Sequence, residues 1–209
     1  MIKFIDKWLV KTSFKLLNIK LQPNQWPIAL SCFLSLMVNS YIGPILCKTA
    51  ISELPPQWLS FETVWCCFSG LFIGMIWKGK FREKALKWFA VLAALESLAG
   101  LSLGMWLAFV KWNVWVYSVF SLFYVSVVSL TISRCIMAFK SKLWNEKSRE
   151  LYDNTDSIVR NVGLLLGGIL AIAFCPSLKI ALMLFSISCL IDDIGWIVTW
   201  FKLREVLKE

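Results

Sequence analysis

The chain has 209 residues, of which 58% are hydrophobic and only 17% are charged, with a formal net charge of +9. Roughly 25% of the residues of a soluble protein are charged, so this composition excludes an ordinary soluble domain and indicates an integral helical membrane protein. The absence of histidine removes the commonest metal ligand and general base. The seven cysteines fall mostly within apolar runs and form no C-x-x-C pair, so we interpret them as small buried hydrophobic residues. We therefore expect no metal site and no cofactor.

The first 24 residues form a segment in which lysines alternate with bulky apolar residues. At helical spacing the apolar side chains share one face and the lysines lie roughly opposite. This pattern predicts an amphipathic helix over residues 1–24 that lies on the membrane surface with its lysines toward anionic lipid. An ordinary cytosolic helix packed on the body of the protein would give the same pattern, and both interpretations stay open. The first 20 residues lack a continuous apolar core, so we expect no cleavable signal peptide.

Six apolar segments follow, each near the roughly 20 residues that a helix needs to cross a bilayer. They lie at about residues 27–47, 61–77, 86–109, 114–137, 158–175 and 180–200. We therefore expect an all-α membrane protein with a six-helix transmembrane domain over residues 25–201 and a short tail at 202–209. The connectors at 78–85 and 138–157 are charged, and we interpret Asp153 and Asp156 in the second of them as part of a solvated loop.

The lysines and arginines are distributed unequally between the two sides of these spans. Nineteen of the 22 fall in the N-terminal segment, the second and fourth connectors with their flanks, and the tail, and only Lys48, Lys111 and Lys179 fall on the other side. This bias predicts that both termini and the charged connectors of a multi-pass cell-membrane protein face the cytoplasm. The positive charge is thus a topology signal, and we expect no nucleic-acid partner.

Polar side chains within the spans predict which helices line a cavity, because hydrocarbon offers them no water. The first span carries such residues at intervals of four and the fourth span carries two polar stripes. The residues expected to line a substrate cavity are Ser31, Ser35, Asn39, Tyr117, Tyr124, Ser126 and Ser129, with Thr131 and Ser133 on the same stripes. Hydrogen bonding between helices is the alternative explanation for these stripes.

Three carboxyl groups fall near the middle of the predicted bilayer. Glu96 lies in the third span, and Asp192 and Asp193 lie in the sixth, with no lysine or arginine at matching depth. Burial without a cation favours the protonated form of a carboxyl group. We therefore expect these three residues to couple protons to a conformational change or to bind a cation. A protonated acid that forms a hydrogen bond to a neighbouring helix is the structural alternative.

Small residues at intervals of four predict close contacts between helices. The G-x-x-x-G pairs are Gly70 with Gly74, Gly100 with Gly104, and Gly163 with Gly167, on the second, third and fifth spans. Each pair alone is a weak signal, and together they predict a tightly packed bundle.

The chain resembles one half of a major facilitator superfamily transporter, which has six spans, cytoplasmic ends and charged second and fourth connectors. The most specific likeness is a charged connector with Arg149 that leads into G-L-L-L-G-G on the fifth span, where Gly163, Gly167 and Gly168 match the glycines of the G-P-x-x-G-G pattern of drug-efflux members. Leu164 replaces the proline of that pattern. The second connector is similar to the family's basic loop motif, with Gly74, Lys78, Gly79, Lys80 and Arg82 in comparable places and no acid.

The resemblance implies a substrate between two six-span halves, so a single half acts as a homodimer or as a heterodimer with another half. The favoured function is proton-coupled export of a small apolar or cationic compound. The glycine pairs and Arg149 are expected to take part in helix packing and in the gating movement of the helices. Two alternatives stay open, namely a non-transporting accessory, immunity or sensor subunit and a six-span substrate-binding subunit of a vitamin importer. We expect no enzyme, because no catalytic constellation is recognisable.

Overall fold

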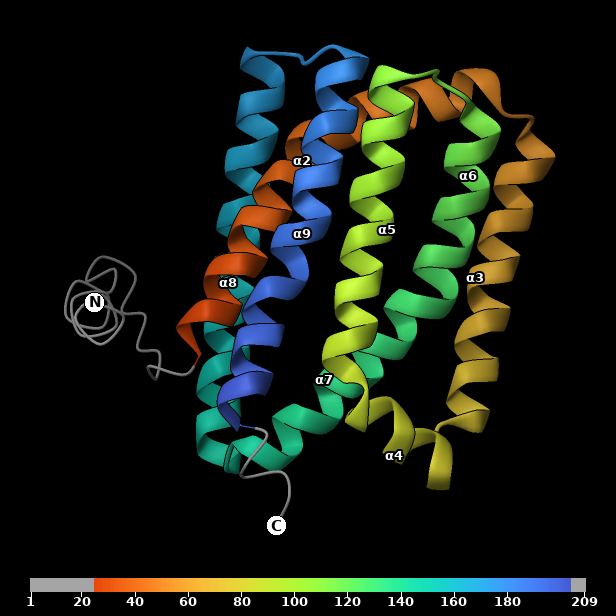
Figure 1. Cartoon of the computed structure of the whole chain (residues 1–209). Coiled ribbons are helices and arrows are strands. Elements are labelled where there is room, and N and C mark those ends of the chain that lie inside the picture. Colours follow the sequence, from red (N-terminus) through yellow and green to blue (C-terminus); the bar gives the residue numbers. More distant parts are fainter. Residues whose placement is uncertain (1–24, 204–209) are drawn as a thin grey trace.

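The computed structural model describes residues 25–203, which fold into helices without any strand in that range. The elements are α2 (Trp26–Glu53), α3 (Pro56–Ile76), α4 (Gly79–Lys87), α5 (Phe89–Phe109), α6 (Val114–Phe123), the π-helix η2 (Tyr124–Ser129), α7 (Leu130–Leu143), α8 (Glu146–Ala173) and α9 (Leu178–Leu203). Figure 1 shows them running up and down an elongated bundle, with short connections at its two ends. The predicted N-terminal amphipathic helix lies outside the described residues, as does most of the predicted tail.

Six helices in the described part of the chain are long and apolar enough to cross a membrane, which confirms the predicted number and order of spans. The continuous run of α6, η2 and α7 forms the fourth of them. The architecture is thus that of an integral multi-pass helical membrane protein. The charged connector at 138–157 is not the solvated loop that we expected, because α7 extends to Leu143 and α8 begins at Glu146. Asn145 accepts a hydrogen bond from the backbone N–H of Ser148 (2.8 Å) and so caps the start of α8.

A row of four helices, in the order α8, α2, α9 and α5, forms the tightly packed part of the bundle (Figure 1). Glycines at each contact allow the backbones to approach. A Cβ atom added to Gly195 of α9 would lie 2.8 Å from the Cα of Ile28 on α2, and one added to Gly163 of α8 would lie 2.9 Å from the carbonyl oxygen of Phe33. Such separations are well below the about 3.5–4.0 Å of normal carbon contacts. Only glycine therefore fits at these positions.

The same geometry occurs between α5 and α9. A Cβ atom on Gly100 would lie 2.6 Å from the Sγ atom of Cys189, and one on Gly104 would lie 2.9 Å from the carbonyl oxygen of Leu182. The sequence prediction of close contacts at the pairs on α5 and α8 therefore agrees with the geometry of the bundle.

The second span, α3, packs much more loosely at the edge of the bundle. Only Ser69 and Ile73 of α3 are buried. A Cβ atom on Gly70 would have no neighbour within 4 Å, and one on Gly74 would meet only the side chain of Arg134 at 3.5 Å. The close helix contact expected at this pair is thus not present within the described residues of one chain.

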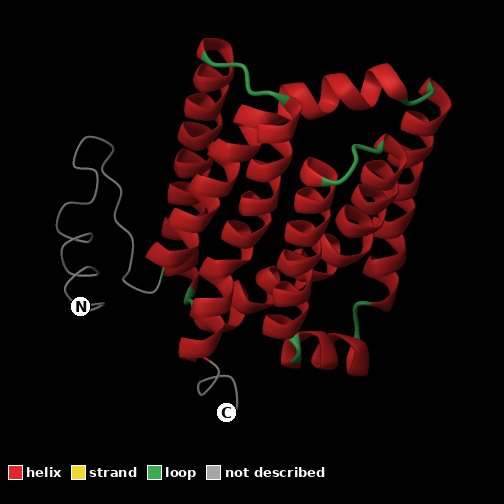
Figure 2. Ribbon diagram, turned by 45° about the horizontal axis from the view of Figure 1, so that its top comes forward, coloured by secondary structure: helices red, strands yellow, loops and turns green. Residues whose placement is uncertain are grey.

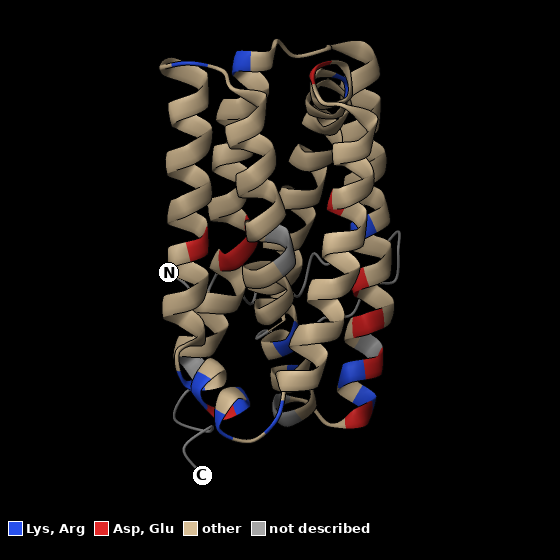
Figure 3. Ribbon diagram, turned by 90° about the vertical axis from the view of Figure 1, so that its right-hand side faces the viewer, with Lys and Arg blue, Asp and Glu red and all other residues tan. Residues whose placement is uncertain are grey.

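Two elements cross the ends of the bundle. Pro44 interrupts the hydrogen-bond ladder of α2, and the remainder of α2 turns across one end of the bundle (Figure 2). At the opposite end the short helix α4 joins α3 to α5 (Figure 1). Figure 3 shows that most lysines and arginines of the described part gather at the α4 end, which agrees with the unequal distribution in the sequence.

Candidate functional site

A cavity of about 220 Å³ lies inside the bundle. Its walls come from α2, α5, η2, α7, α8 and α9, so a single chain supplies all of them. The lining residues are Ile28, Cys32, Ser35, Leu36, Asn39, Glu96, Ser129, Ile132, Ser133, Ile136, Tyr152, Arg160, Asp192, Asp193 and Trp196. The cavity walls therefore do not require the second chain that the sequence led us to expect.

The three carboxyl groups that the sequence singled out all line this cavity. Asp193 is only 5% exposed, and its Oδ2 atom accepts a hydrogen bond from the hydroxyl of Ser97 on α5 at 2.9 Å. Glu96 is 6% exposed, and its Oε2 atom has no hydrogen-bond partner among the described residues. Asp192 is more exposed than the other two acids, and its side chain forms a hydrogen bond with Ser35 of α2 and lies near Arg160 of α8. The third and sixth spans thus bring their acids together, because α5 and α9 pack side by side.

The polar stripe of the first span is divided between the cavity and a helix contact. Ser35 and Asn39 line the cavity, and the amide of Asn39 donates to Ser35 within α2 at 3.3 Å. Asn39 also accepts a hydrogen bond from the hydroxyl of Ser188 at 3.0 Å, which links α2 to α9. Ser31 belongs to the same stripe but lies against Gly195 of α9, and its hydroxyl donates to the carbonyl of Ile28 at 3.0 Å. Ser31 is therefore a packing residue and not part of the cavity wall.

The fourth span is irregular where it passes the cavity. Residues Tyr124–Ser129 form a π-helix, which widens the backbone by one residue and often marks a functional site. This change in phase lets Ser129 line the cavity together with Ser133 of α7. Ser126 lies within the π-helix, but its side chain is outside the part of the chain that the structure describes.

The two tyrosines predicted for the cavity pack elsewhere. Tyr117 lies in an aromatic cluster with Trp112 and Phe185, at ring-centroid separations of 5.7 and 6.1 Å. Tyr124 stacks on Phe120, and one of its ring carbons comes within 3.8 Å of the position of a Cβ atom on Gly100. Neither tyrosine is among the lining residues, but the side chain of Tyr124 forms a hydrogen bond with Glu96 and so supports a cavity acid from behind.

Arg160 and its partners form a part of the site that the sequence analysis missed. The Nε atom of Arg160 donates to Oδ2 of Asp156 at 2.7 Å, one turn earlier on α8. The hydroxyl of Tyr152 donates to the other oxygen of Asp156 at 3.2 Å. Asp156 is 7% exposed, so its assignment to a solvated loop is wrong. Asp153, which we also assigned to that loop, lies in α8 as well and pairs with Lys140 at 2.9 Å.

The placement of Arg160 also corrects the statement that no cation lies at the depth of the acids. Arg160 lines the same cavity as the three carboxyl groups, because α8 begins 12 residues before the predicted start of the fifth span and packs along α2. A signal for this arrangement was present in the sequence, since Asp156 and Arg160 are four residues apart and Tyr152 precedes Asp156 by another four.

A further intramembrane acid, Glu62 on α3, lies away from the cavity. Its Oε1 atom accepts a hydrogen bond from the indole N–H of Trp58 at 2.9 Å and another from the hydroxyl of Ser118 on α6. These contacts satisfy the carboxylate and hold α3 against α6. Glu62 is thus explained as a structural link, which the sequence analysis did not anticipate.

The predicted packing and gating residues on α8 have different surroundings. Gly163 and Gly167 face α2, and a Cβ atom on Gly168 would make only an ordinary contact of 3.8 Å with the hydroxyl of Ser40. Arg149 is exposed in the first turn of α8, and its side chain does not line the cavity. Gly163 and Gly167 therefore hold α8 against α2, which lines the cavity, whereas Gly168 makes only an ordinary contact and Arg149 lies outside the site.

The site combines three carboxyl groups and one guanidinium group in a small chamber between helices that can cross a membrane. Such a chamber can hold protons or a positively charged group. Among the described residues, no three His, Cys, Asp or Glu side chains are placed to hold a metal ion. No family model, no curated protein and no solved structure matches this chain. The likeness to half of a major facilitator superfamily transporter therefore rests on the sequence motifs alone.

Proposed function

We propose that this chain is a membrane transporter that exchanges protons for a small compound, most readily a cationic one. One observation carries this proposal: three carboxyl groups, those of Glu96, Asp192 and Asp193, line one polar cavity within the membrane-crossing part of the bundle. Ionisable residues are rare within transmembrane helices, where they mark substrate, ion and proton pathways.

The charge of the cavity supports a cationic substrate. Arg160 is the one lysine or arginine among the described residues of the wall. It is paired with Asp156 and also lies close enough to Asp192 to interact with it, so three carboxyl groups share one guanidinium group that already has a partner. The volume of about 220 Å³ is smaller than the roughly 300–1,000 Å³ of pockets that take drug-sized ligands. We therefore infer a compact substrate, such as a small organic amine, in the direction of export that the resemblance implies.

The two buried acids differ from the exposed one in a way that suits exchange. Asp192 lines the cavity and is exposed, whereas the other two acids are buried. Glu96 and Asp193 are buried; Oε2 of Glu96 has no hydrogen-bond partner among the described residues, and Oδ2 of Asp193 accepts one hydrogen bond, from Ser97. A proton that binds at this pair would displace a cation, and a cation would displace the proton.

A second copy of the chain remains our proposal for the working assembly. The outward face of α3 carries large exposed apolar side chains, among them Phe68, Leu71 and Met75. The pair Gly70 and Gly74 lies on the same helix and has no close backbone neighbour among the described residues. At 3.6 residues per turn, Gly70 and Gly74 lie on another side of α3 from Phe68, Leu71 and Met75, and Gly74 is turned toward Arg134 of the same chain. The proposal of a parallel dimer of half-transporters therefore rests on the apolar side chains of the loosely packed α3 and on the resemblance, and not on the glycine pair.

The experiment that tests the transport proposal uses purified protein in liposomes under an imposed proton gradient. Radiolabelled tetramethylammonium, a compact cation, serves as the probe, and a pH-sensitive dye reports the counterflow of protons. We expect wild-type protein to move both, and Asp193→Asn and Glu96→Gln to stop both. Asp153→Asn is the matched control, because Asp153 pairs with Lys140 away from the cavity. Unchanged coupling in Asp193→Asn would remove that acid from the mechanism.

A non-transporting accessory subunit is the second candidate. It is favoured by the hydrogen bonds from Ser188 to Asn39 and from Ser97 to Asp193, which join neighbouring helices and would serve a purely structural role equally well. If wild-type protein moves neither tetramethylammonium nor protons but purifies with a different membrane protein, this second function replaces the first.

A further inference from the structure

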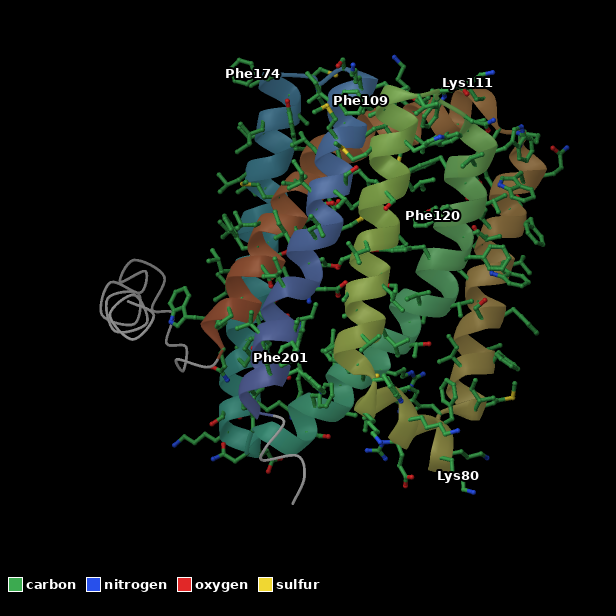
Figure 4. All side chains as sticks on the ribbon, in the orientation of Figure 1. Lys80, Phe109, Lys111, Phe120, Phe174 and Phe201 are labelled. Carbon is green, nitrogen blue, oxygen red and sulfur yellow. The ribbon has the colours of Figure 1, made fainter. Side chains whose placement is uncertain are left out.

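The second connector forms a compact basic surface at one end of the bundle. Helix α4 contacts α5 and α7, and only Ala85 of its nine residues is buried. Its exposed charged residues, together with the residue before it, are Lys78, Lys80, Arg82, Glu83, Lys84 and Lys87. Lys80 is labelled in Figure 4 and points away from the bundle. The surface therefore carries five cations and a single acid.

Exposed aromatic side chains accompany these cations. Phe81 is 39% exposed and Trp88 is 54% exposed, and the ring of Phe81 packs edge-on against Trp77 at 6.0 Å. Because α4 joins the membrane-crossing helices α3 and α5 through one or two residues at each end, it has to lie at the level where these helices leave the bilayer. Aromatic rings at that level are typical of residues that anchor in the headgroup region.

Arg134 of α7 adds a sixth cation beside the start of α4. Its Nη2 atom lies 3.5 Å from the position of a Cβ atom on Gly74, so the guanidinium group crosses the gap between α7 and the last turn of α3. Among the residues that the structure describes, Arg134 has no acidic partner. The absence of a side chain at Gly74 leaves space beside the guanidinium for an oxygen-bearing group of another molecule.

We propose that α4 and Arg134 form a binding surface for the headgroups of anionic phospholipids. Charge complementarity identifies the partner, because five lysines and arginines at the membrane surface are attracted to the negative potential of an anionic leaflet. Arg134 takes a headgroup phosphate in a defined position, and the lysines of α4 hold further anionic lipids less specifically. This proposal is independent of the transported compound.

The test uses the purified full chain in detergent, mixed with equal amounts of phosphatidylglycerol and phosphatidylcholine, and measures the retained lipids by native mass spectrometry. The first variant carries Lys80→Gln, Arg82→Gln and Lys84→Gln. Its matched control carries Lys48→Gln, Lys111→Gln and Lys179→Gln, which remove the same number of charges from exposed positions at the opposite end. Figure 4 labels Lys111 at that end.

We expect wild-type protein to retain phosphatidylglycerol in preference to phosphatidylcholine, and this preference to weaken as salt screens the charges. In the α4 variant the ratio of retained phosphatidylglycerol to phosphatidylcholine should fall at least about tenfold, because each cation at the surface contributes separately to the attraction. The opposite-end control should keep it. Arg134→Gln should remove the most tightly held phosphatidylglycerol and leave the weaker ones.

Three results would overturn the proposal. The first is equal retention of both lipids by wild-type protein. The second is an equal loss of preference in both triple variants, which would show an effect of net charge alone. The third is displacement of phosphatidylglycerol by soluble polyglutamate at equal charge concentration, which would assign the surface to an acidic protein partner.

Discussion

Replacing Gly167 by alanine gives the sharpest test of how α8 is held against α2. The new Cβ atom would lie 2.8 Å from the Cβ atom of Ser40 and would also contact the carbonyl oxygen of Met37. Met37 contributes backbone at this point, which cannot rotate away as a side chain could. Since normal contacts are about 3.5–4.0 Å, α8 has to retreat by roughly 1 Å.

The matched control is Gly70→Ala, because a Cβ atom on Gly70 has no neighbour within 4 Å. Both changes raise helix propensity by up to about 1 kcal/mol, so the difference between the two variants isolates the clash. Forcing an extra methyl group into a packed site typically costs about 1–3 kcal/mol. The retreat would also stretch the 2.8 Å hydrogen bond from the hydroxyl of Ser40 to the carbonyl of Leu164.

The assay is thermal unfolding of both purified variants in the same detergent, followed by circular dichroism. We expect the midpoint of Gly167→Ala to lie a few degrees, and up to about 10 °C, below that of Gly70→Ala. Equal midpoints would refute the close approach of α2 and α8. That result would also remove the reason for placing Arg160 in the cavity wall, because α8 carries this residue.

Three further predictions concern the cavity itself. Ser97→Ala removes the hydroxyl that donates to Asp193 at 2.9 Å. Thermal unfolding should show that the free energy of unfolding falls by about 0.6 kcal/mol, and by at most about 1.7 kcal/mol, as is usual for hydrogen bonds between transmembrane helices. A decrease of several kcal/mol would contradict this description of the contact. Arg160→Gln leaves the carboxylate of Asp156 buried without its cation. Breaking a fully buried ion pair typically costs about 3–5 kcal/mol of stability. We expect a smaller loss here, because the Arg160 side chain is 52% exposed. Adding Asp156→Asn to that variant should recover most of the stability, and an additive further loss would count against the pair. Cys32 lines the cavity, and in a variant whose other six cysteines are replaced by serine it should react with a small water-soluble methanethiosulfonate, as measured by intact mass. Failure to react would mean that the reagent does not reach this wall.

The sequence by itself determined the class of the protein and the order of its spans. Six apolar segments of bilayer length are visible without any tertiary information, because the hydrocarbon requires each span to satisfy its own backbone hydrogen bonds. The acids Glu96, Asp192 and Asp193 were recognisable for a related reason, since a carboxyl group within an apolar helix needs a polar environment. The start of α8 was not recognisable, because its first turns are charged and resemble a loop in composition.

The tertiary structure alone decided which polar faces meet and which side chains the helix contacts cover. Ser31 and Ser35 share one stripe of α2, yet Gly195 lets α9 close over Ser31 while Ser35 stays open to the cavity. Helical periodicity assigns residues to a face, but the neighbour that covers the face depends on where two backbones can approach. For the same reason Gly163 and Gly167 pack against α2, whereas Gly70 has no close neighbour among the residues 25–203 that the structure describes. Arg160 joins the acids only because α8 packs along α2, a contact between segments far apart in the sequence that no local pattern specifies.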